Sequence, residues 1–481
     1  MQQITNNRRT KILATLGPAT DSPEKLAALF KAGVNIVRLN FSHGTHDEQL
    51  QRIKWVREVA SDLGIYVGII ADLQGPKIRV ANFANGPIHL QSGDRFTLDA
   101  AQDDDSGDQH SVGIDYKDLP NDVSTGDTLL LNDGQISMTV IDVSGSKINC
   151  EVVNGGKLSN HKGINRLGGG LSAKALTDKD RKDLKFAVEQ NVCLIAISFP
   201  RHADDILEAK NLIRQTGVTE MPGVIAKIER AEAIDEIESI IIASDGVMVA
   251  RGDLAVEIGD AEVPLVQKAI IKHARSLDRP VIVATQMMES MIHCSVPTRA
   301  EVSDVANAVL DNVDAVMLSA ETAAGDYPVE TVAAMDRVCR RVEMQPGSHV
   351  SGHRIELNFE YTYEAIAMAA MYTANHYQCA AIVALTTSGR TPLIMSRIRT
   401  AIPIFAFSDS IKTLRRMTLY RGVVPVYFEA KYNSSAEEIS DTVKQKIKEL
   451  ITTKDQDKVL LTKGEVAGEK GGTNTLKILN F

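Results

Sequence analysis

Six apolar runs in the sequence end in polar residues whose types could do chemistry together. Most of these residues form pairs two positions apart, a spacing that points both side chains to the same face of a β-strand. A solvated strand end would explain any one of them, but six such ends in one chain indicate a shared polar site. Run by run, the residues are Arg38 and Asn40, Asp72, Lys227 and Glu229, Arg251 and Asp253, Thr285 and Gln286, and Ser319 and Glu321.

The carboxylates and cations in this set predict phosphoryl transfer. Glu229 and Asp253 offer hard oxygen ligands on successive runs, which suits a magnesium ion that keeps several waters. Arg38, Lys227 and Arg79 supply positive charge, and phosphoryl transfer depends on alignment and on neutralising the phosphoryl oxygens. No cysteine and histidine cluster suggests a transition-metal site, and no GxxxxGK[ST] motif predicts a P-loop.

The elements that must position these residues alternate between strand and helix. Eight short β-branched runs lie between residues 10 and 342, and amphipathic helical patterns such as residues 46–64 separate most of them. Near-continuous apolar strands joined by helices indicate a parallel sheet. Eight such units predict an α/β fold built on a (β/α)8 barrel, with a doubly wound open sheet as the alternative. A barrel gathers its strand ends at one mouth, where active sites are built.

The stretch after the third run interrupts this alternation. It has strand-like runs and turn signals but no long helical period, so we expect an inserted all-β domain, well placed to act as a lid. Its nine aspartates between 99 and 127 fit a solvated surface, and the glycines at 168–170 fit a domain hinge. The predicted domains are the catalytic barrel at 1–72 and 171–342, the inserted β lid domain at 73–170, and a C-terminal α/β regulatory domain at 343–481.

Composition limits the partners and the compartment. The chain has 481 residues and a net charge of −9, which argues against nucleic acid or an anionic membrane as a partner. The N-terminal stretch MQQITNNRRTK predicts no signal peptide, and no apolar run approaches the roughly 18 residues of a membrane helix. Five cysteines without a CxxC pair fit buried thiols in a reducing compartment, so we expect a cytoplasmic protein.

Several segments, taken together, resemble pyruvate kinase of the bacterial type. They occur in the family's order and cover all three predicted domains, and the insertion after the third strand also resembles that family. The segments are TKILATLGPAT, NIVRLNFSHG, ADLQGPKIR, IAKIERAEA, VMVARGDLAVEIG, ATQMMESM, PTRAEVSDVANAVLDNVDAVMLSAETAAGDYP and SGRT.

The resemblance implies the last step of glycolysis, in which phosphoenolpyruvate phosphorylates ADP to give pyruvate and ATP in a homotetramer that uses Mg²⁺ or Mn²⁺. Matching positions imply roles for individual residues. Lys227 would neutralise the phosphoryl group in flight, Arg38 would grip the phosphate, Thr285 would sit beside the enolate carbon, Ser319 would be a weaker candidate for proton relay, Glu229 and Asp253 would hold the divalent ion, and Arg79 and Glu321 would lie on the nucleotide side.

The same resemblance implies a monovalent-cation site next to the phosphate. Asn40, Ser42 and Asp72, with the main-chain carbonyl of Leu73, match its ligands. Potassium-dependent relatives resemble DTKGPEIR here, with glutamate at the position of Lys77. The Lys77 ammonium could replace the charge of potassium, so we expect K⁺ not to be required and the chain to resemble the potassium-independent branch. A solvated turn lysine, with the potassium requirement intact, is the alternative.

The loop ALTTSGRT in the C-terminal domain is a second predicted anion site. Hydroxyls and backbone N–H groups at a helix start suit a phosphate, although an ordinary N-cap has the same composition. The resemblance favours an allosteric effector. The stretch TKGEVAGEKGGTN lacks the Trp and Arg of relatives that bind fructose 1,6-bisphosphate, so we expect a monophosphate, either a sugar monophosphate or AMP. The loop residues are Thr386, Thr387, Ser388, Gly389, Arg390 and Thr391.

Two other functions fit parts of the pattern. A barrel lyase could handle phosphoenolpyruvate or pyruvate with magnesium on similar strand ends, but it would not need the inserted domain or consume ADP. A catalytically silent binding module could sense a phosphorylated metabolite through the TTSGRT loop. Loss of Lys227, Glu229 or Asp253 would favour the silent module, and all three residues are present.

Overall fold

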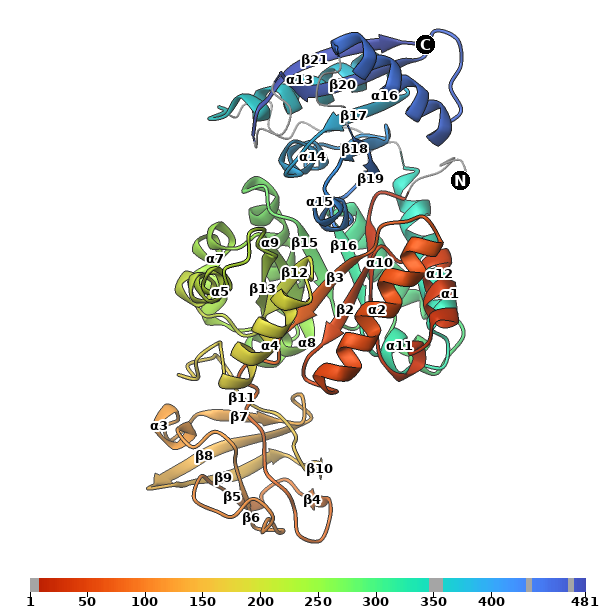
Figure 1. Ribbon diagram of the computed structural model, residues 1–481. Helices are drawn as coiled ribbons and strands as arrows, with labels where there is room; N and C mark the ends of the chain where they lie inside the picture. The colour runs from red at the N-terminus through yellow and green to blue at the C-terminus, as the bar shows by residue number, and fades with distance from the viewer. Residues whose placement is uncertain (1–7, 346–357, 430–434, 466–470) are drawn as a thin grey trace. The chain divides into compact units, whose positions relative to one another are not determined.

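The computed structural model describes residues 8–345, 358–429, 435–465 and 471–481 (Figure 1). Eight parallel strands form a closed barrel in the order β1, β16, β15, β14, β13, β12, β3, β2. The expected (β/α)8 barrel is therefore confirmed, and the open-sheet alternative is wrong. The strands are β1 Lys11–Thr15, β2 Ile36–Asn40, β3 Gly68–Asp72, β12 Leu194–Ile197, β13 Gly223–Ile228, β14 Gly246–Ala250, β15 Val281–Ala284 and β16 Ala315–Leu318.

These strands form because most of their residues are apolar on both faces. Every residue of β1, β3, β13 and β14 is buried, as expected for strands between a packed barrel interior and an outer layer of helices. Larger helices are α1 Pro23–Ala32, α2 His46–Asp62, α4 Asp178–Glu189, α5 Ala203–Gln215, α7 Ile237–Ala243, α9 Val263–Ser276, α10 Arg299–Leu310 and α12 Pro328–Glu343. Shorter ones are η1 Pro18–Thr20, α6 Glu232–Asp235, α8 Arg251–Ile258, η2 Glu289–Ile292 and α11 Ala320–Ala323.

Helix starts carry the expected local signals. Thr45 begins α2 and Thr298 begins α10 as capping boxes, in which each hydroxyl accepts the N–H of a glutamate three residues on. Ser22 caps α1 by accepting the N–H of Lys25, without a capping box, and is followed by Pro23 at the first helical position. These signals mark where α1, α2 and α10 begin.

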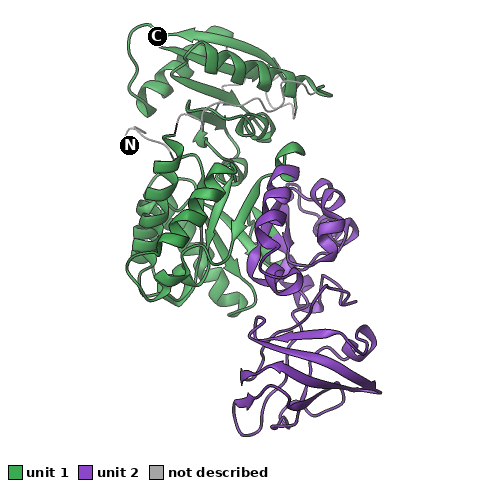
Figure 2. Cartoon of the chain, turned by 180° about the vertical axis from the view of Figure 1, so that it is seen from behind, with its two compact units in different colours: residues 1–72, 186–195, 274–481 green, residues 73–185, 196–273 purple. Residues whose placement is uncertain are grey.

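The chain divides into two compact units (Figure 2). One comprises residues 1–72, 186–195 and 274–481, and the other comprises residues 73–185 and 196–273. The first therefore holds the strands before the insertion, β15, β16 and the C-terminal domain. The second holds the inserted domain together with β13 and β14. The expected three-domain boundaries stay a prediction.

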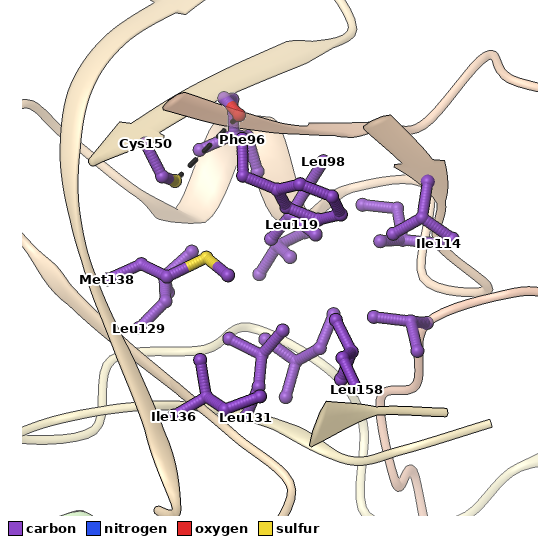
Figure 3. Packing of buried hydrophobic residues seen from close by; sticks show 14 of the residues in the cluster. Phe96, Leu98, Ile114, Leu119, Leu129, Leu131, Ile136, Met138, Cys150 and Leu158 are labelled. Atoms are coloured by element: carbon purple, nitrogen blue, oxygen red, sulfur yellow. Dashed lines mark hydrogen bonds between the residues drawn. The ribbon is translucent and has the colours of Figure 1, made fainter. Parts of the chain in front are cut away.

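The inserted domain is an all-β structure with its own core. A six-stranded sheet has the order β11, β7, β8, β9, β5, β6, and β4 pairs with β10. Figure 3 shows Phe96, Leu98, Leu129, Met138 and neighbouring apolar side chains packed together inside it. The aspartates at 103–105 on its loops are exposed, as expected for a solvated surface. The elements are β4 Ile88–Leu90, β5 Arg95–Asp99, β6 Ser111–Gly113, α3 Leu119–Asp122, β7 Thr128–Leu131, β8 Ile136–Ser144, β9 Lys147–Asn154, β10 Gly156–Leu158 and β11 Ile164–Arg166.

The C-terminal domain is a five-stranded α/β sheet in the order β19, β18, β17, β20, β21. Only the pairing of β20 with β21 is antiparallel among the strand pairs described in this sheet. The elements are α13 Thr362–His376, β17 Ala381–Leu385, α14 Arg390–Ser396, β18 Ile404–Ser408, α15 Ile411–Met417, β19 Val423–Tyr427, α16 Ala436–Leu450, β20 Lys458–Gly464 and β21 Thr473–Asn480.

Buried charges join this domain to the barrel strands of its own unit. Arg397, which follows α14 and has no solvent exposure, donates from both Nη atoms to the Asp314 carboxylate at the start of β16. Arg421 Nη1 donates to Glu343 Oε1 over 3.2 Å, and the Lys11 ammonium donates to the carbonyl of Val423 over 2.7 Å. Leaving one member of such a pair buried without the other would be costly, so these pairs favour this docking of the domain.

Two expectations about composition can be compared with the structure. All five cysteines are free thiols, but only Cys150, Cys193, Cys339 and Cys379 are buried. Cys294 is exposed because it lies in the loop after η2, so the expectation of buried thiols is wrong there. None of the helices that the structure describes combines the length and apolar character needed to cross a bilayer.

Candidate functional site

Arg38 and Asp72 form a buried ion pair between the ends of β2 and β3. The strands run in parallel register with Arg38 beside Ile70 and Asn40 beside Asp72. Arg38 Nε lies 2.5 Å from Asp72 Oδ2, and its Nη1 donates to Thr15 Oγ1 over 3.2 Å. Asp72 is 1% exposed, so its carboxylate depends on this guanidinium for neutralisation.

Two of the expected ligand atoms of the monovalent cation accept hydrogen bonds from the protein. Asn40 and Asp72 are register neighbours, and the Ser42 N–H donates to Asn40 Oδ1 over 3.1 Å. The Leu73 carbonyl, expected as a fourth ligand, accepts the Ser198 hydroxyl over 2.6 Å. The amide oxygen and the main-chain carbonyl are thus already engaged by protein donors.

Thr285, Ser319 and Glu321 lie at the ends of β15 and β16. Thr285 has a positive φ of 67°, a strained conformation for a β-branched residue. Glu321 is 2% exposed, and its two oxygens accept the N–H groups of Met288 and Ser319. Burial raises the pKa of Glu321 despite these donors. Its carboxylate therefore holds the loops after both strands in place.

Lys227 and Glu229 occupy the end of β13 as a hydrogen-bonded pair. The Lys227 ammonium donates to Glu229 Oε1 over 2.8 Å and to Ser198 Oγ over 2.7 Å. The second glutamate oxygen accepts the Phe199 N–H over 3.0 Å. Lys227 is 9% exposed and Glu229 is 1% exposed, so an otherwise costly buried carboxylate is balanced by a buried ammonium.

Asp253 lies in the first turn of α8 and meets a lysine of the inserted domain. The Lys77 ammonium donates to Asp253 Oδ1 over 3.2 Å and lies 3.8 Å from Asp133 Oδ1. Arg251, two residues before Asp253, is buried. The Lys77 ammonium is thus paired with a carboxylate from α8 while its side chain stays partly exposed, and its role in place of potassium stays a prediction.

Arg79 is held within the inserted domain. Its Nη1 donates to the His161 carbonyl over 2.8 Å, and its N–H donates to Asp115 Oδ1 over 2.7 Å. These bonds hold the backbone and the guanidinium of Arg79 to loops of the same domain. The expected nucleotide role of Arg79 stays a prediction.

The carboxylates of Glu229 and Asp253 fit a divalent ion by their chemistry. Both are hard oxygen donors, and each faces an ammonium group, which shows that each position stabilises positive charge. Within the described ranges no group of three or more His, Cys, Asp or Glu side chains is arranged to hold a metal. Two carboxylates completed by water and substrate oxygens are what Mg²⁺ commonly uses, whereas an all-protein cage is not.

Four further residues complete the site, and sequence reasoning did not single them out. Ser198 and Phe199 follow β12, and both hydrogen-bond to the Lys227–Glu229 pair. Arg230 and Glu257 line a small pocket with Lys77 and Phe199. Ser198 could have been found, because it is a polar residue at the end of an apolar run like the others. Phe199 carries no such signal, since its contribution is a backbone N–H and a positive φ of 54°.

The predicted effector loop folds tightly against its neighbours. Gly389 has a φ of 77°, and its N–H donates to Thr386 Oγ1 over 2.9 Å. Arg416 Nη2 donates to the Ser388 carbonyl over 2.7 Å, and the Arg390 guanidinium lies 5.5 Å from the centre of the Tyr363 ring. The Thr391 hydroxyl is 2.8 Å from that of Thr473. Part of the late loop TKGEVAGEKGGTN, residues 466–470, lies outside the described residues.

Comparisons with known proteins give one consistent result. A family described as "Pyruvate kinase, barrel domain" matches residues 7–332, and one described as "Pyruvate kinase, alpha/beta domain" matches residues 364–479. "Pyruvate kinase II" of Salmonella typhimurium is 52% identical over 478 residues, covering 98% of both chains. "Pyruvate kinase" of Haemophilus influenzae is 53% identical over 445 residues, covering 91% of this chain and 93% of its own. "Pyruvate kinase" of Geobacillus stearothermophilus is 41% identical over 475 residues, covering 98% of this chain and 80% of its own.

Glu257 makes the stability of its unit depend on pH. Burial raises its pKa from 4.5 to about 7, and this rise is opposed by the Ala231 N–H and by Arg230. Folding therefore favours the protonated carboxyl of Glu257. The stability that this preference gives is fully present below pH 4.5 and is lost as pH rises through about 7. Wild type should lose on the order of 3 kcal/mol of unfolding free energy between pH 4.5 and 8 relative to Glu257→Gln. Urea unfolding of both proteins across this range measures it, and parallel pH profiles would contradict it.

Proposed function

The chain belongs to the pyruvate kinase family, and we propose that Lys227, Glu229 and Asp253 carry the family's reaction here. That reaction transfers the phosphoryl group of phosphoenolpyruvate to ADP and yields pyruvate and ATP. The observation that supports this assignment most directly is the Lys227 ammonium, held between Ser198 Oγ and Glu229 Oε1 in a buried position.

Lys227 is the group that neutralises the phosphoryl oxygens during transfer. The bond between phosphorus and the enol oxygen breaks as a bond forms to the terminal oxygen of ADP, and negative charge spreads over the oxygens in flight. The Ser198 hydroxyl and the Glu229 carboxylate fix the ammonium in one place, so little reorganisation is needed when that charge develops. A fixed ammonium in a buried site is worth more than one in water.

Glu229 and Asp253 would hold the divalent ion, Mg²⁺ or Mn²⁺. When bound, the ion supplies charge neutralisation and a template for the substrate oxygens. The Phe199 N–H orients the Glu229 carboxylate by donating a 3.0 Å hydrogen bond to Oε2. Lys77 holds Asp253 in a comparable way, through the 3.2 Å bond to Oδ1. Both carboxylates are thus positioned by the protein itself.

Other strand-end residues would bind and protonate the substrate. Arg38 would grip the phosphate, and its bond to Asp72 orients the guanidinium for that task. Thr285 would lie beside the enolate carbon, with its strained backbone fixing the hydroxyl position. Ser319 would take part in the proton relay to that carbon, while Arg79 and Glu321 would lie on the nucleotide side.

We also propose that Lys77 makes activity independent of potassium. Its ammonium supplies a fixed positive charge beside the catalytic carboxylate Asp253. Asp72, an expected potassium ligand, is already neutralised by Arg38. The charge that potassium would bring is thus supplied by side chains of the chain itself, although Asn40, Ser42 and Asp72 remain able to bind a cation.

The loop from Thr386 to Thr391 is proposed to bind a phosphorylated effector, either a sugar monophosphate or AMP. Its hydroxyls and the nearby guanidinium of Arg416 offer donors and positive charge for one phosphate. The resemblance to the family further implies a homotetramer with small-molecule substrates, while composition and net charge favour a cytoplasmic protein with neither nucleic acid nor membrane as a partner.

Replacing Lys227 with Met should remove most phosphoryl transfer and spare folding. Loss of the fixed ammonium should lower kcat by about 10³-fold or more, as for other cations that stabilise a transferring phosphoryl group. Coupled measurement of pyruvate formation checks it, with the exposed Lys182→Met on α4 as a control of equal charge change. Turnover near that of wild type in Lys227→Met would rule out this mechanism.

Removing potassium should not slow the wild-type enzyme. With Mg²⁺ and tetramethylammonium at matched ionic strength, we expect rates within about twofold with and without K⁺, because Lys77 supplies the charge. Lys77→Glu should fall by at least about tenfold when K⁺ is withdrawn and recover when it is restored. A wild-type rate that collapses without K⁺ would contradict the role of Lys77 while leaving the reaction intact.

A sugar monophosphate or AMP should lower the phosphoenolpyruvate concentration needed for half-maximal rate. Ser388→Asp should abolish this effect, since a carboxylate in the loop repels phosphate, and should leave the rate without effector unchanged. Saturation curves with and without each compound measure it. An effector response that persists unchanged in Ser388→Asp would place the effector elsewhere.

A further inference from the structure

The segment from Gly168 to Ser172, where the chain leaves the inserted domain, is fastened rather than loose. Three consecutive glycines predicted a hinge. Yet the Gly168 N–H donates to the Glu257 carbonyl over 2.9 Å, and the Gly170 N–H lies 2.5 Å from Glu232 Oε1. The segment is therefore bonded to residues of α6 and α8, outside the inserted domain.

Three arginines bind the carbonyls of the same segment. Arg230 Nη1 donates to the Leu171 carbonyl over 2.9 Å, and Arg201 Nη1 donates to the Ser172 carbonyl over 3.1 Å. Arg166 Nη1, from β11, donates to the Gly169 carbonyl over 3.1 Å. Hydrogen bonds from charged donors are stronger than neutral ones, so the segment is held at nearly every residue.

The glycines are required because the Glu232 carboxylate lies directly against bare backbone. Gly168, Gly169 and Gly170 have φ values of 83°, 76° and 90°, which favour glycine. A Cβ on Gly169 would lie 2.6 Å from Glu232 Oε2 and 3.0 Å from Oε1. The triple glycine thus serves close contact with a carboxylate as well as backbone freedom.

Glu232 is retained at a cost. Its Oε2 is buried and makes no hydrogen bond to any residue that the structure describes. A buried carboxylate oxygen without a partner is unfavourable, and such atoms in a native structure call for an explanation. The other oxygen of Glu232 offers an explanation. Oε1 accepts the Gly170 N–H and so ties the inserted domain to the turn that carries Glu232.

That turn also carries Glu229. Arg230 follows it directly, and the Arg230 guanidinium lies 5.8 Å from the centre of the Phe199 ring. Phe199 in turn donates its N–H to Glu229 Oε2. Phe199 keeps a φ of 54°, an uncommon and strained conformation for a bulky residue. A shift of Glu229 would therefore be passed to Arg230, and through it to Leu171.

We propose that Arg230 and Glu232 are positioning residues that fasten the segment 168–172 to the turn carrying Glu229, so that metal binding and the order of this connection are coupled. The proposal rests on the proposed role of Glu229 as a metal ligand. Coupling of this kind is reciprocal: metal at Glu229 tightens the connection, and a loosened connection weakens the response to metal.

Amide hydrogen exchange of residues 168–172, with and without Mn²⁺ and without substrates, tests this coupling. In wild type, Mn²⁺ should slow exchange at Gly168 and Gly170. Glu232→Ala should speed exchange at Gly170 by at least about tenfold, because the acceptor is lost, and should abolish the Mn²⁺ response. Glu232→Gln keeps an acceptor oxygen and should restore much of the response. The exposed Glu238→Ala on α7 is the charge-matched control and should behave as wild type.

Mn²⁺ binding is measured separately by electron paramagnetic resonance. This measurement distinguishes a failure of the coupling from a failure of the proposed metal role of Glu229. Binding to wild type without any change in exchange at 168–172 would overturn the coupling alone. Absence of Mn²⁺ binding would overturn the metal role of Glu229 and the coupling with it. Unaltered exchange in Glu232→Ala would also contradict the proposal. If that variant does not fold, Arg230→Gln, which removes the donor to the Leu171 carbonyl, should lose the Mn²⁺ response instead.

Discussion

A carboxylate withdrawn from water must be balanced by a cation or by hydrogen-bond donors, and several carboxylates of this structure meet that need with a lysine or an arginine. The pattern recurs in pairs at the end of one strand and in pairs drawn from different elements. Short pairs bring strand ends together, and long-range pairs dock one domain on the strands of another. The pairs are Glu229 with Lys227, Asp72 with Arg38, Asp253 with Lys77, Asp314 with Arg397, and Glu343 with Arg421.

The same constraint explains how one arrangement can serve both stability and catalysis. The Lys227 ammonium pairs with Glu229 in the protein alone, and in the proposed mechanism the same fixed ammonium neutralises the phosphoryl group. Glu257 lacks a cation that balances its charge fully. Burial raises the pKa of Glu257 to about 7, and Arg230 only partly offsets this rise. Arg230 also binds the Leu171 carbonyl, so electrostatic balance and domain connection share a side chain.

The barrel and the polar strand ends could be predicted because both have local signals, namely buried β-branched runs and the polar residue that closes each run. Which partner each residue meets could not be predicted, since this is set by tertiary structure. Lys77 pairs with Asp253, 176 residues away, and Gly170 within the glycine run donates its N–H to Glu232. Phe199 contributes through its backbone, for which its side-chain type gives no signal. The reaction itself came from the resemblance, which the family comparisons confirm.

The most direct test of this account is a Mn²⁺ titration of the substrate-free protein, followed by electron paramagnetic resonance. Glu229→Gln keeps the size of the side chain but removes its charge, and Glu238→Gln makes the same change at an exposed glutamate on α7, away from the proposed metal site. The account predicts that Glu229→Gln weakens Mn²⁺ binding by at least about tenfold while Glu238→Gln binds as wild type. Equal Mn²⁺ affinity in wild type and Glu229→Gln would contradict it.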